Sequence, residues 1–554
     1  MASKRAAKAH YTDRSAPSGK TAGIAALPDM SVATAMPGTV PGPVTPEGMS
    51  LGRQIAKGAV FMVALRCVFR LLGLMSSLIL LRVLAPTDFG VIGLVTAALA
   101  ILELMSELSF QSALICMPNP KRAHYDTAWT LGILRGAAMA ALLAASAPAL
   151  AVFVDDPRIV ALSYALAGIA LLQGFENVGL VDFQRSLAFD RFFRFQVFGK
   201  VAGVCVTVPL AFWLHNYWAL MAGIAATRLS MAGLSYVISD YRPRLSLAAW
   251  RDLFNFSKWL LVSNLESVID SYAMIFVTGH VAGPAAIGLY QVANHIASLP
   301  ASEVAAPIRQ PMYAGMSRAA HDMAQLRHHV IDGLGLSVAV VTPMSVGIAL
   351  MAQPIVDLFF GPQWTGAVTL VQLCALYALF DSVGHFTHNL YIVMQRQRRF
   401  VGTYAAALLV RVPALILGAA IAGVNGAACA LMLTAIFNMV LWSCGIFPLA
   451  GIRYREVFLG TWRTVFGALV MTVAVLWLSA LWLTSQDYSL ALLRFVVLCL
   501  TGAAVHVGSQ FAAWRISGSP AGAEQHLIKT AFQALERLGI WPRPRPAQPS
   551  PVRS

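Results

Sequence analysis

Residues 61–81 read FMVALRCVFRLLGLMSSLILL, a stretch that is long and apolar enough to cross a lipid bilayer as one helix. Two arginines, Arg66 and Arg70, stand four residues apart inside it and therefore share one face of that helix. A charged side chain at the centre of a bilayer costs about 2.5–3.5 kcal/mol on insertion scales. Such side chains are expected to face an ion-pair partner or a hydrated cavity rather than lipid.

The composition of the whole chain is that of a polytopic membrane protein. Of its 554 residues, 58% are hydrophobic and 12% are charged, whereas about a quarter of the residues in a soluble globular protein are charged. Apolar runs of spanning length recur along almost the whole sequence. The formal net charge of +15 is expected to reflect which loops face the cytoplasm, so nucleic acid is not a predicted partner.

The sequence predicts neither a cofactor nor a metal site. All seven cysteines lie in apolar stretches, without the spacing of metal ligands, which favours a role as small buried residues. A phosphate-binding glycine loop of the Walker type does not occur, which argues against ATP hydrolysis by this chain.

Hydropathy predicts an all-α protein with about fourteen transmembrane helices. The predicted spans cover residues 55–84, 88–116, 127–153, 159–181, 195–214, 217–239, 254–280, 285–316, 331–352, 365–394, 400–421, 425–449, 461–483 and 490–514. Residues 1–50 are expected to form a disordered cytoplasmic tail, because they are rich in Ala, Pro, Ser and Gly. Residues 516–554 are expected to form a second cytoplasmic tail with a candidate amphipathic helix.

Basic residues alternate between successive loops. Counted together with the span ends that adjoin them, the connections after even-numbered spans hold sixteen Lys and Arg residues, the last of which is Arg463. Those after odd-numbered spans hold Arg82 and Arg158. Because positively charged loops stay on the cytoplasmic side, both termini are predicted to be cytoplasmic. The connections on the outer side are too short to fold into a domain.

Two segments of the chain indicate an internal repeat. Residues 83–95 read VLAPTDFGVIGLV and residues 280–292 read HVAGPAAIGLYQV, so that Pro86 matches Pro284 and Gly90 matches Gly288 at a separation of 198 residues. An even number of spans separates the copies, which predicts two pseudo-symmetric six-helix lobes with the same orientation, at residues 51–240 and 241–450. Two further helices at 451–515 would follow them. Chance similarity between two turn motifs is the alternative.

Charged residues in the first lobe are the first candidates for a functional site. Glu103 and Glu107 also stand four residues apart, and they match Arg70 and Arg66 in depth if the first two spans form a hairpin. Two interpretations stay open: structural ion pairs between helices, or a polar wall of a water-filled cavity in which the arginines attract an anion. The other basic candidates for this cavity lie deep in later spans and are Arg135, Arg228 and Arg411.

The second lobe carries polar residues of a different kind, dominated by carboxylates and imidazoles. Asn264 is a further candidate for the cavity wall. The candidates for ion or proton coupling are Glu266, Asp270, His295, Asp381 and His385. A protonation relay is one interpretation, because desolvation shifts the pKa values of such groups readily. Satisfied hydrogen bonds between helices are the other.

Four segments resemble a known family. They read LRVLAPTDFGVIGLV (81–95), DFQRSLAFDRFFRFQ (182–196), GPAAIGLYQVANHIASLPASEVAAPIRQPMYAGMSR (283–318) and LFFGPQWTGAVTLVQLCAL (358–376). In order and spacing they resemble the Wzx-type flippases, the polysaccharide-exporting branch of the multidrug/oligosaccharidyl-lipid/polysaccharide (MATE-like) superfamily. The resemblance covers about residues 50–450.

The resemblance implies two six-helix lobes around a central cavity, followed by two extra helices. It implies export of undecaprenyl-diphosphate-linked oligosaccharide repeat units across the inner membrane, for exopolysaccharide or lipopolysaccharide assembly. Rocking of the two lobes would expose the cavity to each side in turn, so transport is expected to occur by alternating access. It also implies that basic residues in the cavity hold the diphosphate, and the positions that match this role are Arg66 and Arg70, followed by Arg135, Arg228 and Arg411. The implied partners are the lipid-linked oligosaccharide and membrane lipids, with a polysaccharide polymerase and export complex as candidate protein partners.

Two functions of other classes remain as alternatives. A cation-coupled multidrug exporter on the same scaffold would favour a cavity dominated by carboxylates, and the first lobe instead carries two central arginines. An integral-membrane glycan polymerase or ligase would need a sizeable outer loop with candidate acid, base or diphosphate-binding residues, and no such loop is predicted. The protein is therefore expected to be a transporter and not an enzyme.

Overall fold

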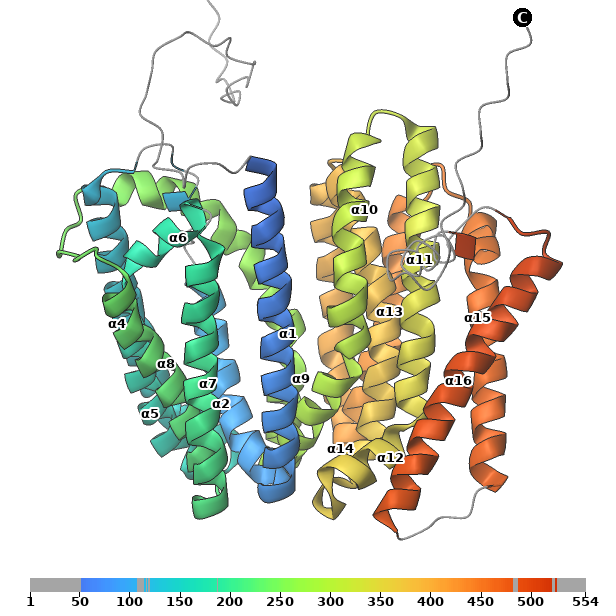
Figure 1. The fold of residues 1–554 in the computed structure, drawn as a ribbon, viewed down its shortest axis with the longest axis horizontal. Coiled ribbons are helices and arrows are strands. Elements are labelled where there is room, and N and C mark those ends of the chain that lie inside the picture. Colours follow the sequence, from blue (N-terminus) through green and yellow to red (C-terminus); the bar gives the residue numbers. More distant parts are fainter. Residues whose placement is uncertain are drawn as a thin grey trace, which may run out of the picture. The chain divides into compact units, whose positions relative to one another are not determined.

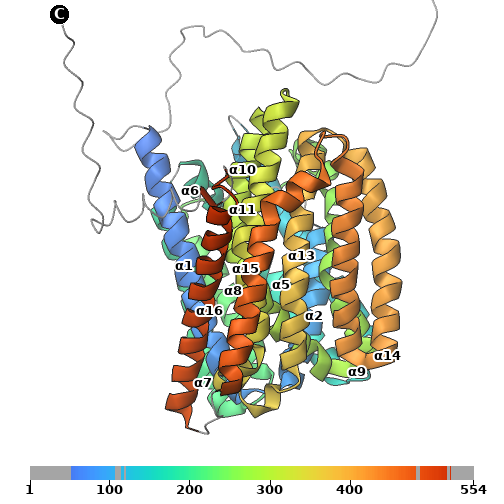
Figure 2. The ribbon, with the colours of Figure 1, turned by 90° about the vertical axis from the view of Figure 1, so that its right-hand side faces the viewer.

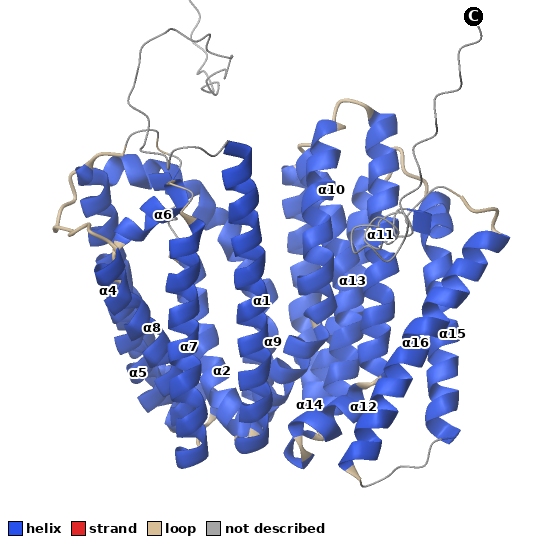
Figure 3. Ribbon diagram, viewed as in Figure 1, coloured by secondary structure: helices blue, strands red, loops and turns tan. Residues whose placement is uncertain are grey.

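The computed structural model describes residues 51–106, 114, 115, 117, 120–186, 188–481, 487–520, 524 and 525. They belong to one compact unit, Met49–Ser554. Within these ranges every regular element is a helix (Figure 3). The predicted tails at 1–50 and, apart from a few residues, at 516–554 lie outside the described residues.

The helices before residue 250 are α1 (Leu51–Val83), α2 (Pro86–Met105), α4 (Arg122–Val154), α5 (Arg158–Gln173), η1 (Val178–Leu180), α6 (Val181–Arg185), α7 (Phe189–Leu214) and α8 (Trp218–Ile238). The remaining helices are α9 (Trp250–Ala297), π-helix η2 (Pro300–Ala305), α10 (Ala306–Arg318), α11 (Met323–Leu350), α12 (Ala352–Ile355), π-helix η3 (Val356–Phe360), η4 (Pro362–Trp364), α13 (Ala367–Val393), α14 (Gln397–Ile446), α15 (Tyr454–Leu481) and α16 (Tyr488–Ile516). Figure 1 shows them as a bundle of long, roughly parallel rods. Residues 51–249 are called the N-half below, and residues 250–481 the C-half.

Eleven helices in the described ranges are long and apolar enough to cross a membrane. A twelfth candidate is the pair α5 and η1–α6, which meet at an angle of 62°. The predicted span 159–181 is therefore broken after Gln173, where Asn177 caps the next turn by accepting a hydrogen bond from the Gly179 amide at 2.9 Å. The count confirms a polytopic all-α protein but does not confirm the predicted number of fourteen.

Two of these helices are too long to be single spans. The 48 residues of α9 would extend about 72 Å as a straight helix, against a hydrocarbon core of about 30 Å. Gly283 in α9 has φ 75° and Gly423 in α14 has φ 58°, values that favour glycine and interrupt the helix. A Cβ placed on Gly279 would lie 2.8 Å from the Ile287 side chain, which shows that the chain turns back on itself at the first break.

The two ends of the bundle are named here by the residues found there. The Pro86 end is the end where α1 passes into α2, and the Arg122 end is the end where α4 begins (bottom and top of Figure 1). The turn at the Pro86 end is set locally: Pro86 occupies the first helical position of α2, and Asp88 Oδ2 accepts a hydrogen bond from the Ala85 amide at 3.1 Å.

The largest hydrophobic core lies at the Pro86 end and contains side chains from both halves. Val91 and Leu94 of α2 and Leu162 of α5 pack there with Ile287 of α9 and Leu431 of α14. A smaller core at the same end joins Leu81 of α1 to Val292, Val356, Trp364 and other C-half residues. At this end the N-half and the C-half therefore share one apolar interior.

At the Arg122 end, each half has a core of its own. Tyr125, Ala128 and Val181 pack together in the N-half, whereas Leu326 and Phe386 belong to a core built from C-half helices. The two halves are thus joined through the Pro86 end, and their apolar interiors diverge toward the Arg122 end.

The repeat found in the sequence lies at the shared end, and its two copies face each other. A Cβ placed on Gly90 would overlap the carbonyl oxygen of Pro284, and a Cβ placed on Gly288 would overlap the carbonyl oxygen of Pro86. The glycine of each copy therefore packs against the proline of the other copy. This reciprocal contact is the arrangement that a two-fold relation between the copies produces.

A second reciprocal pair lies at the same end. Arg82 closes α1 and donates a hydrogen bond to the carbonyl of Phe359 at 3.0 Å, and a further one to Leu358. His280 Nδ1 lies 2.8 Å from the carbonyl oxygen of Phe153 at the end of α4. Arg82 and His280 are 198 residues apart, the same separation as in the repeat, so each half reaches across to a backbone carbonyl of the other.

The last segment of the N-half, residues 239–249, is held against α4 at the Arg122 end. The Arg244 amide donates to Asp126 Oδ1 at 2.8 Å, and the Tyr241 hydroxyl donates to the same oxygen. The Ser246 amide donates to Thr130 Oγ1 at 2.9 Å. Burial and the contact with Asp126 raise the pKa of Tyr241, so its phenol stays neutral and keeps donating at physiological pH.

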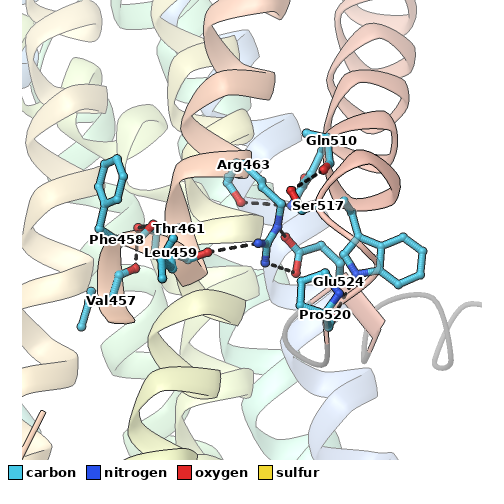
Figure 4. A network of polar contacts seen from close by, with 12 residues as sticks. Val457, Phe458, Leu459, Thr461, Arg463, Gln510, Ser517, Pro520 and Glu524 are labelled. Atoms are coloured by element: carbon cyan, nitrogen blue, oxygen red, sulfur yellow. Dashed lines mark hydrogen bonds and ion pairs between the residues drawn. The ribbon is translucent and has the colours of Figure 1, made fainter. Parts of the chain in front are cut away.

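Helices α15 and α16 pack against each other, and α15 packs on α11 (Figure 2). Arg463 lies within α15 and forms a buried ion pair with Glu524, with nitrogen–oxygen distances of 2.7 and 3.1 Å (Figure 4). The two side chains are 7% and 6% exposed. The sequence pattern groups Arg463 with the basic loop residues, and the structure corrects this, because Arg463 is buried within α15 and pairs with Glu524 after the end of α16.

Candidate functional site

The candidate site is a group of charged side chains where the N-half meets the C-half in the middle of the helices. Arg70 lies in α1, about 20 Å from the Pro86 end by helical rise. Its Nη1 lies 3.6 Å from Glu303 Oε1 in η2, and the two side chains are 25% and 34% exposed. This separation is too long for a hydrogen bond, so the pair is a loose electrostatic contact between the two halves.

The guanidinium of Arg70 keeps unused hydrogen-bonding capacity. Within the described residues, its Nη2 atom is buried and has no hydrogen-bond partner. Leaving a buried donor unsatisfied costs about 1–3 kcal/mol, and more when the group is charged. An anion that reached this nitrogen would remove that cost, which makes Arg70 a candidate for anion binding.

Two further groups from opposite halves lie close to this pair. His295 of α9 is exposed, and the charges that act on it are those of Arg70, Glu303 and Lys200. Lys200 comes from α7 of the N-half. The net charge is +1 for the group formed by Arg70, Lys200 and Glu303. His295 is not included in this sum. We call these four residues the central cluster.

A second group of charges lies wholly within the N-half. Glu103 Oε1 of α2 lies 3.8 Å from Arg228 Nη2 of α8. Arg135 of α4 donates to the main-chain carbonyl of Glu103 at 3.0 Å and to Ser106 Oγ at 3.0 Å. This group is closer to neutral than the central cluster, because Glu176 also acts electrostatically on Arg228.

The predicted pairing of α1 with α2 is not the one in the structure. Arg70 is paired with Glu303 and Glu103 with Arg228, because α2 packs mainly on α9 while α1 packs on α7. Arg70 and Glu103, which match in depth on the first two helices, therefore do not pair with each other. Arg66 is exposed one turn from Arg70, and Glu107 lies outside the described residues.

The remaining candidates lie outside the two groups of charges, or their side chains are not among those the structure describes. Arg411 of α14 is 4% exposed and donates to the Tyr377 hydroxyl at 3.3 Å, so it belongs to the interior of the C-half. Asp381 of α13 is half-buried. The side chains of Asn264, Glu266, Asp270 and His385 lie outside the described part of the chain, and their roles stay predictions.

Glu303 and Lys200 are the residues of the central cluster that the sequence-based candidates did not include. Glu303 is the single carboxylate in the predicted span 285–316, and its position between Pro300 and Pro307 is a signal that was available. The sequence does not show that this turn faces α1, because the contact joins helices more than 230 residues apart.

Two apolar cavities flank α15. One of about 510 Å³ is lined by α11, α13, α14 and α15, and one of about 340 Å³ by α11, α15 and α16. Their walls are almost entirely hydrocarbon, which suits apolar chains rather than a charged headgroup. In the described ranges no three His, Cys, Asp or Glu side chains come together as metal ligands.

Comparisons with known proteins agree with this picture. The chain is 22% identical over 422 residues to the lipopolysaccharide biosynthesis protein WzxC of Escherichia coli strain K12, covering 75% of this chain and 85% of that protein. It is 23% identical over 300 residues to the succinoglycan biosynthesis transport protein ExoT of Rhizobium meliloti strain 1021, covering 54% and 61%.

Solved structures show the same fold. The structure is similar to that of the lipid II flippase MurJ in an inward closed conformation, with a TM-score of 0.62 and 12% identity over 82% of this chain and 99% of that chain. An inward-facing multidrug transporter of the MATE family matches with a TM-score of 0.54 and 14% identity over 69% and 94%. A family model described as polysaccharide biosynthesis protein matches residues 79–369. Because this match covers more than half of the sequence, the chain belongs to the polysaccharide biosynthesis protein family.

Proposed function

We propose that this protein is a flippase for lipid-linked oligosaccharides. Its cargo is an undecaprenyl-diphosphate-linked repeat unit used for exopolysaccharide or lipopolysaccharide assembly. Family membership, the named relatives and the fold shared with the lipid II flippase support this function. The observation that carries it is the net positive central cluster between the halves, in which the buried Nη2 of Arg70 has no acceptor among the described residues.

The physical task is to move a charged diphosphate and a polar glycan through hydrocarbon while the polyprenyl tail stays in lipid. An unpaired ion in a low-dielectric medium is very costly unless polar groups replace its water. Arg70 and Lys200 supply positive charge at mid-depth, and Arg66 is exposed one turn away. Together they lower the cost for the diphosphate while leaving the neutral sugars solvated.

The shared core makes rocking of the two halves the natural transport motion. Since the halves are joined at the Pro86 end and have separate cores at the Arg122 end, the described state is closed at the Pro86 end. We propose that the Arg122 end, where the basic loops lie, faces the cytoplasm together with both termini, and that the membrane is the inner membrane. The reverse state would require the core at the Pro86 end to part.

Energy coupling belongs to the same proposal. Glu266, Asp270, His295, Asp381 and His385 are the candidates for binding an ion or a proton during the cycle. The variant Asp270→Asn removes the negative charge with little change in size, and it is expected to abolish the response of transport to an imposed pH gradient or membrane potential. Transport by this variant that still follows both gradients would remove Asp270 from the coupling.

A multidrug exporter is the second candidate, because MATE transporters share the fold. The excess positive charge of the central cluster opposes the binding of amphipathic cations and favours the first candidate. An enzymatic role as polymerase or ligase is not part of the proposal. A polysaccharide polymerase and export complex are the proposed protein partners, since the flipped repeat unit must be handed on.

The function is tested with Arg70→Ala in cells that lack their own flippase. We expect polymer output to fall at least tenfold, corresponding to about 1.4 kcal/mol of lost stabilisation, while the abundance of the protein in the membrane stays near that of the wild type. Flipping of a labelled undecaprenyl-diphosphate oligosaccharide in proteoliposomes should fall in parallel.

Arg318→Ala is the matched control. Arg318 is exposed at the Arg122 end of α10, and its Nε donates to the carbonyl of Ala314 in its own helix at 3.4 Å. We expect this variant to retain wild-type export. Wild-type polymer output by Arg70→Ala at wild-type abundance, or resistance to cationic drugs without any polymer export, would reject the proposed function.

A further inference from the structure

The contact between Arg70 and Glu303 joins the two halves at the level of the central cluster. The nitrogen–oxygen distance of 3.6 Å is long for such a pair. Glu303 Oε1 also accepts a long hydrogen bond, of 3.4 Å, from the neighbouring Ser302 hydroxyl. The carboxylate of Glu303 is therefore weakly held. It lies next to the Arg70 guanidinium, whose Nη2 has no hydrogen-bond partner among the described residues.

The backbone around Glu303 differs from that of the spans on either side. Glu303 lies in η2, a π-helical turn over Pro300–Ala305 between α9 and α10. π-Helical turns are rare, and they occur frequently at functional sites because they displace a side chain from the regular helical surface. The turn packs against α11, α10 and α13, so the C-half holds the carboxylate in place while Arg70 belongs to the N-half.

We propose that Glu303 is an exchangeable counter-ion that occupies the anion site of Arg70 when no cargo is bound. The idea rests on the proposed function, since it assigns the diphosphate as the ligand that takes the place of the carboxylate. A diphosphate carries more negative charge than one carboxylate and presents several acceptor oxygens. It therefore satisfies both terminal nitrogens of Arg70, whereas Glu303 approaches one of them.

This exchange links cargo binding to the relative position of the halves. Without cargo, the ion pair draws α1 and η2 together. With cargo, Arg70 is neutralised by the diphosphate, and the electrostatic attraction between the halves at this level is lost. After release of the cargo, Glu303 neutralises Arg70 again, so the empty protein does not have to carry an uncompensated cation through the return step.

The same arrangement makes Glu303 a residue that determines specificity. A ligand with a single weak negative charge does not compete with a tethered carboxylate, because the tether keeps the local concentration of Glu303 high. A ligand with more than one charge on adjacent groups does compete. Glu303 is thus a positioning residue that acts through Arg70 and not by direct contact with the cargo.

The experiment compares the purified full-length wild type with Glu303→Gln, which keeps the shape of the side chain and removes its charge. The probe is inorganic pyrophosphate, and the measurement is its Kd. We expect Glu303→Gln to bind pyrophosphate about tenfold more tightly, whereas flipping of the lipid-linked oligosaccharide in proteoliposomes falls at least tenfold. A residue with a merely structural role would weaken binding and transport together.

Two variants complete the test. Glu303→Asp shortens the side chain and lengthens the ion pair, so its Kd should lie between those of the wild type and Glu303→Gln; it carries the test alone if the glutamine variant does not fold. Glu456→Gln is the matched control, because Glu456 pairs with Arg327 inside the C-half, and it should leave the Kd unchanged.

The outcomes separate this inference from the function on which it rests. Unchanged or weaker pyrophosphate binding by both Glu303 variants overturns the counter-ion role, even if the wild type flips the lipid-linked oligosaccharide. If the wild type does not flip that lipid, the proposed function fails, and tighter binding by Glu303→Gln still identifies Glu303 as the competitor for the anion site. Tighter binding with wild-type flipping overturns the link to the transport cycle.

Discussion

The contacts between the two halves differ in kind between the Pro86 end and the middle of the bundle. At the Pro86 end a shared apolar core, two reciprocal glycine contacts and hydrogen bonds onto backbone carbonyls join them. In the middle, a loose ion pair between Arg70 and Glu303 links them. The first kind of contact depends on shape and the second on charge.

This difference indicates how the two regions work. Close packing tolerates little change, because one extra methyl group forces neighbouring atoms apart. A part-exposed ion pair depends weakly on geometry, and another ion of the same sign can replace either partner. The Pro86 end is therefore suited to closing one side of the protein, whereas the middle is suited to exchanging a counter-ion for cargo.

The largest effect is expected where the contact depends most on shape. Gly90→Ala and Gly288→Ala each place a methyl group against the backbone of a proline in the other half. Overpacking of this kind costs about 1–3 kcal/mol, and here it falls on the contact that closes the Pro86 end. We expect either variant to lower the melting temperature in detergent and to reduce polymer export at least tenfold.

Gly73→Ala is the control for both variants, since a Cβ added at Gly73 would meet no described atom within 4 Å apart from its own stretch of helix. It should leave export and melting temperature close to wild type. Because the contact is reciprocal, Gly90→Ala and Gly288→Ala should behave alike. A strong defect in one variant and none in the other would show that the two glycine contacts do not contribute equally to closing the Pro86 end.

A smaller effect is expected from the side chains that reach across the same end. Arg82 donates to two carbonyls of η3, whereas His280 contacts one carbonyl of α4. Hydrogen bonds from charged groups contribute about 1.5–3 kcal/mol and neutral ones about 0.5–1.5 kcal/mol. Arg82→Ala should therefore lower the melting temperature more than His280→Ala. An equal or reversed order would show that these contacts do not close the Pro86 end.

Much of the fold could be predicted from the sequence because its main signals are local. Apolar runs indicate membrane helices, and the separation of 198 residues between Pro86 and Pro284 located the repeat whose copies face each other in the structure. The interruption after Gln173 has no such local signal, because the run around it is as apolar as one continuous membrane helix. Hydropathy measures composition and does not detect such a break.

The site could be predicted only in part, because it depends on which helices are neighbours. The cost of a charge inside a membrane span is a local signal and points to Arg70, but the sequence offers a partner for it only on the adjacent helix of the chain. Since α1 packs on α7 and α2 on α9, the partner is Glu303 from the other half. Depth along a helix can be estimated from one sequence, whereas the direction in which a side chain points depends on packing between distant segments.

The smallest effect is expected from an ion pair that lies within one half, away from the contact between halves. Arg327 of α11 and Glu456 of α15 form a bidentate pair in the C-half. Part-exposed pairs of this kind contribute little to stability, and both helices move together if the halves rock. Glu456→Gln should therefore leave polymer export unchanged and shift the melting temperature only slightly. Since the same chemical change at Glu303 is expected to alter export strongly, a comparable defect in Glu456→Gln would mean that any lost Arg–Glu pair impairs this protein. The position of Glu303 between the halves would then have no special role.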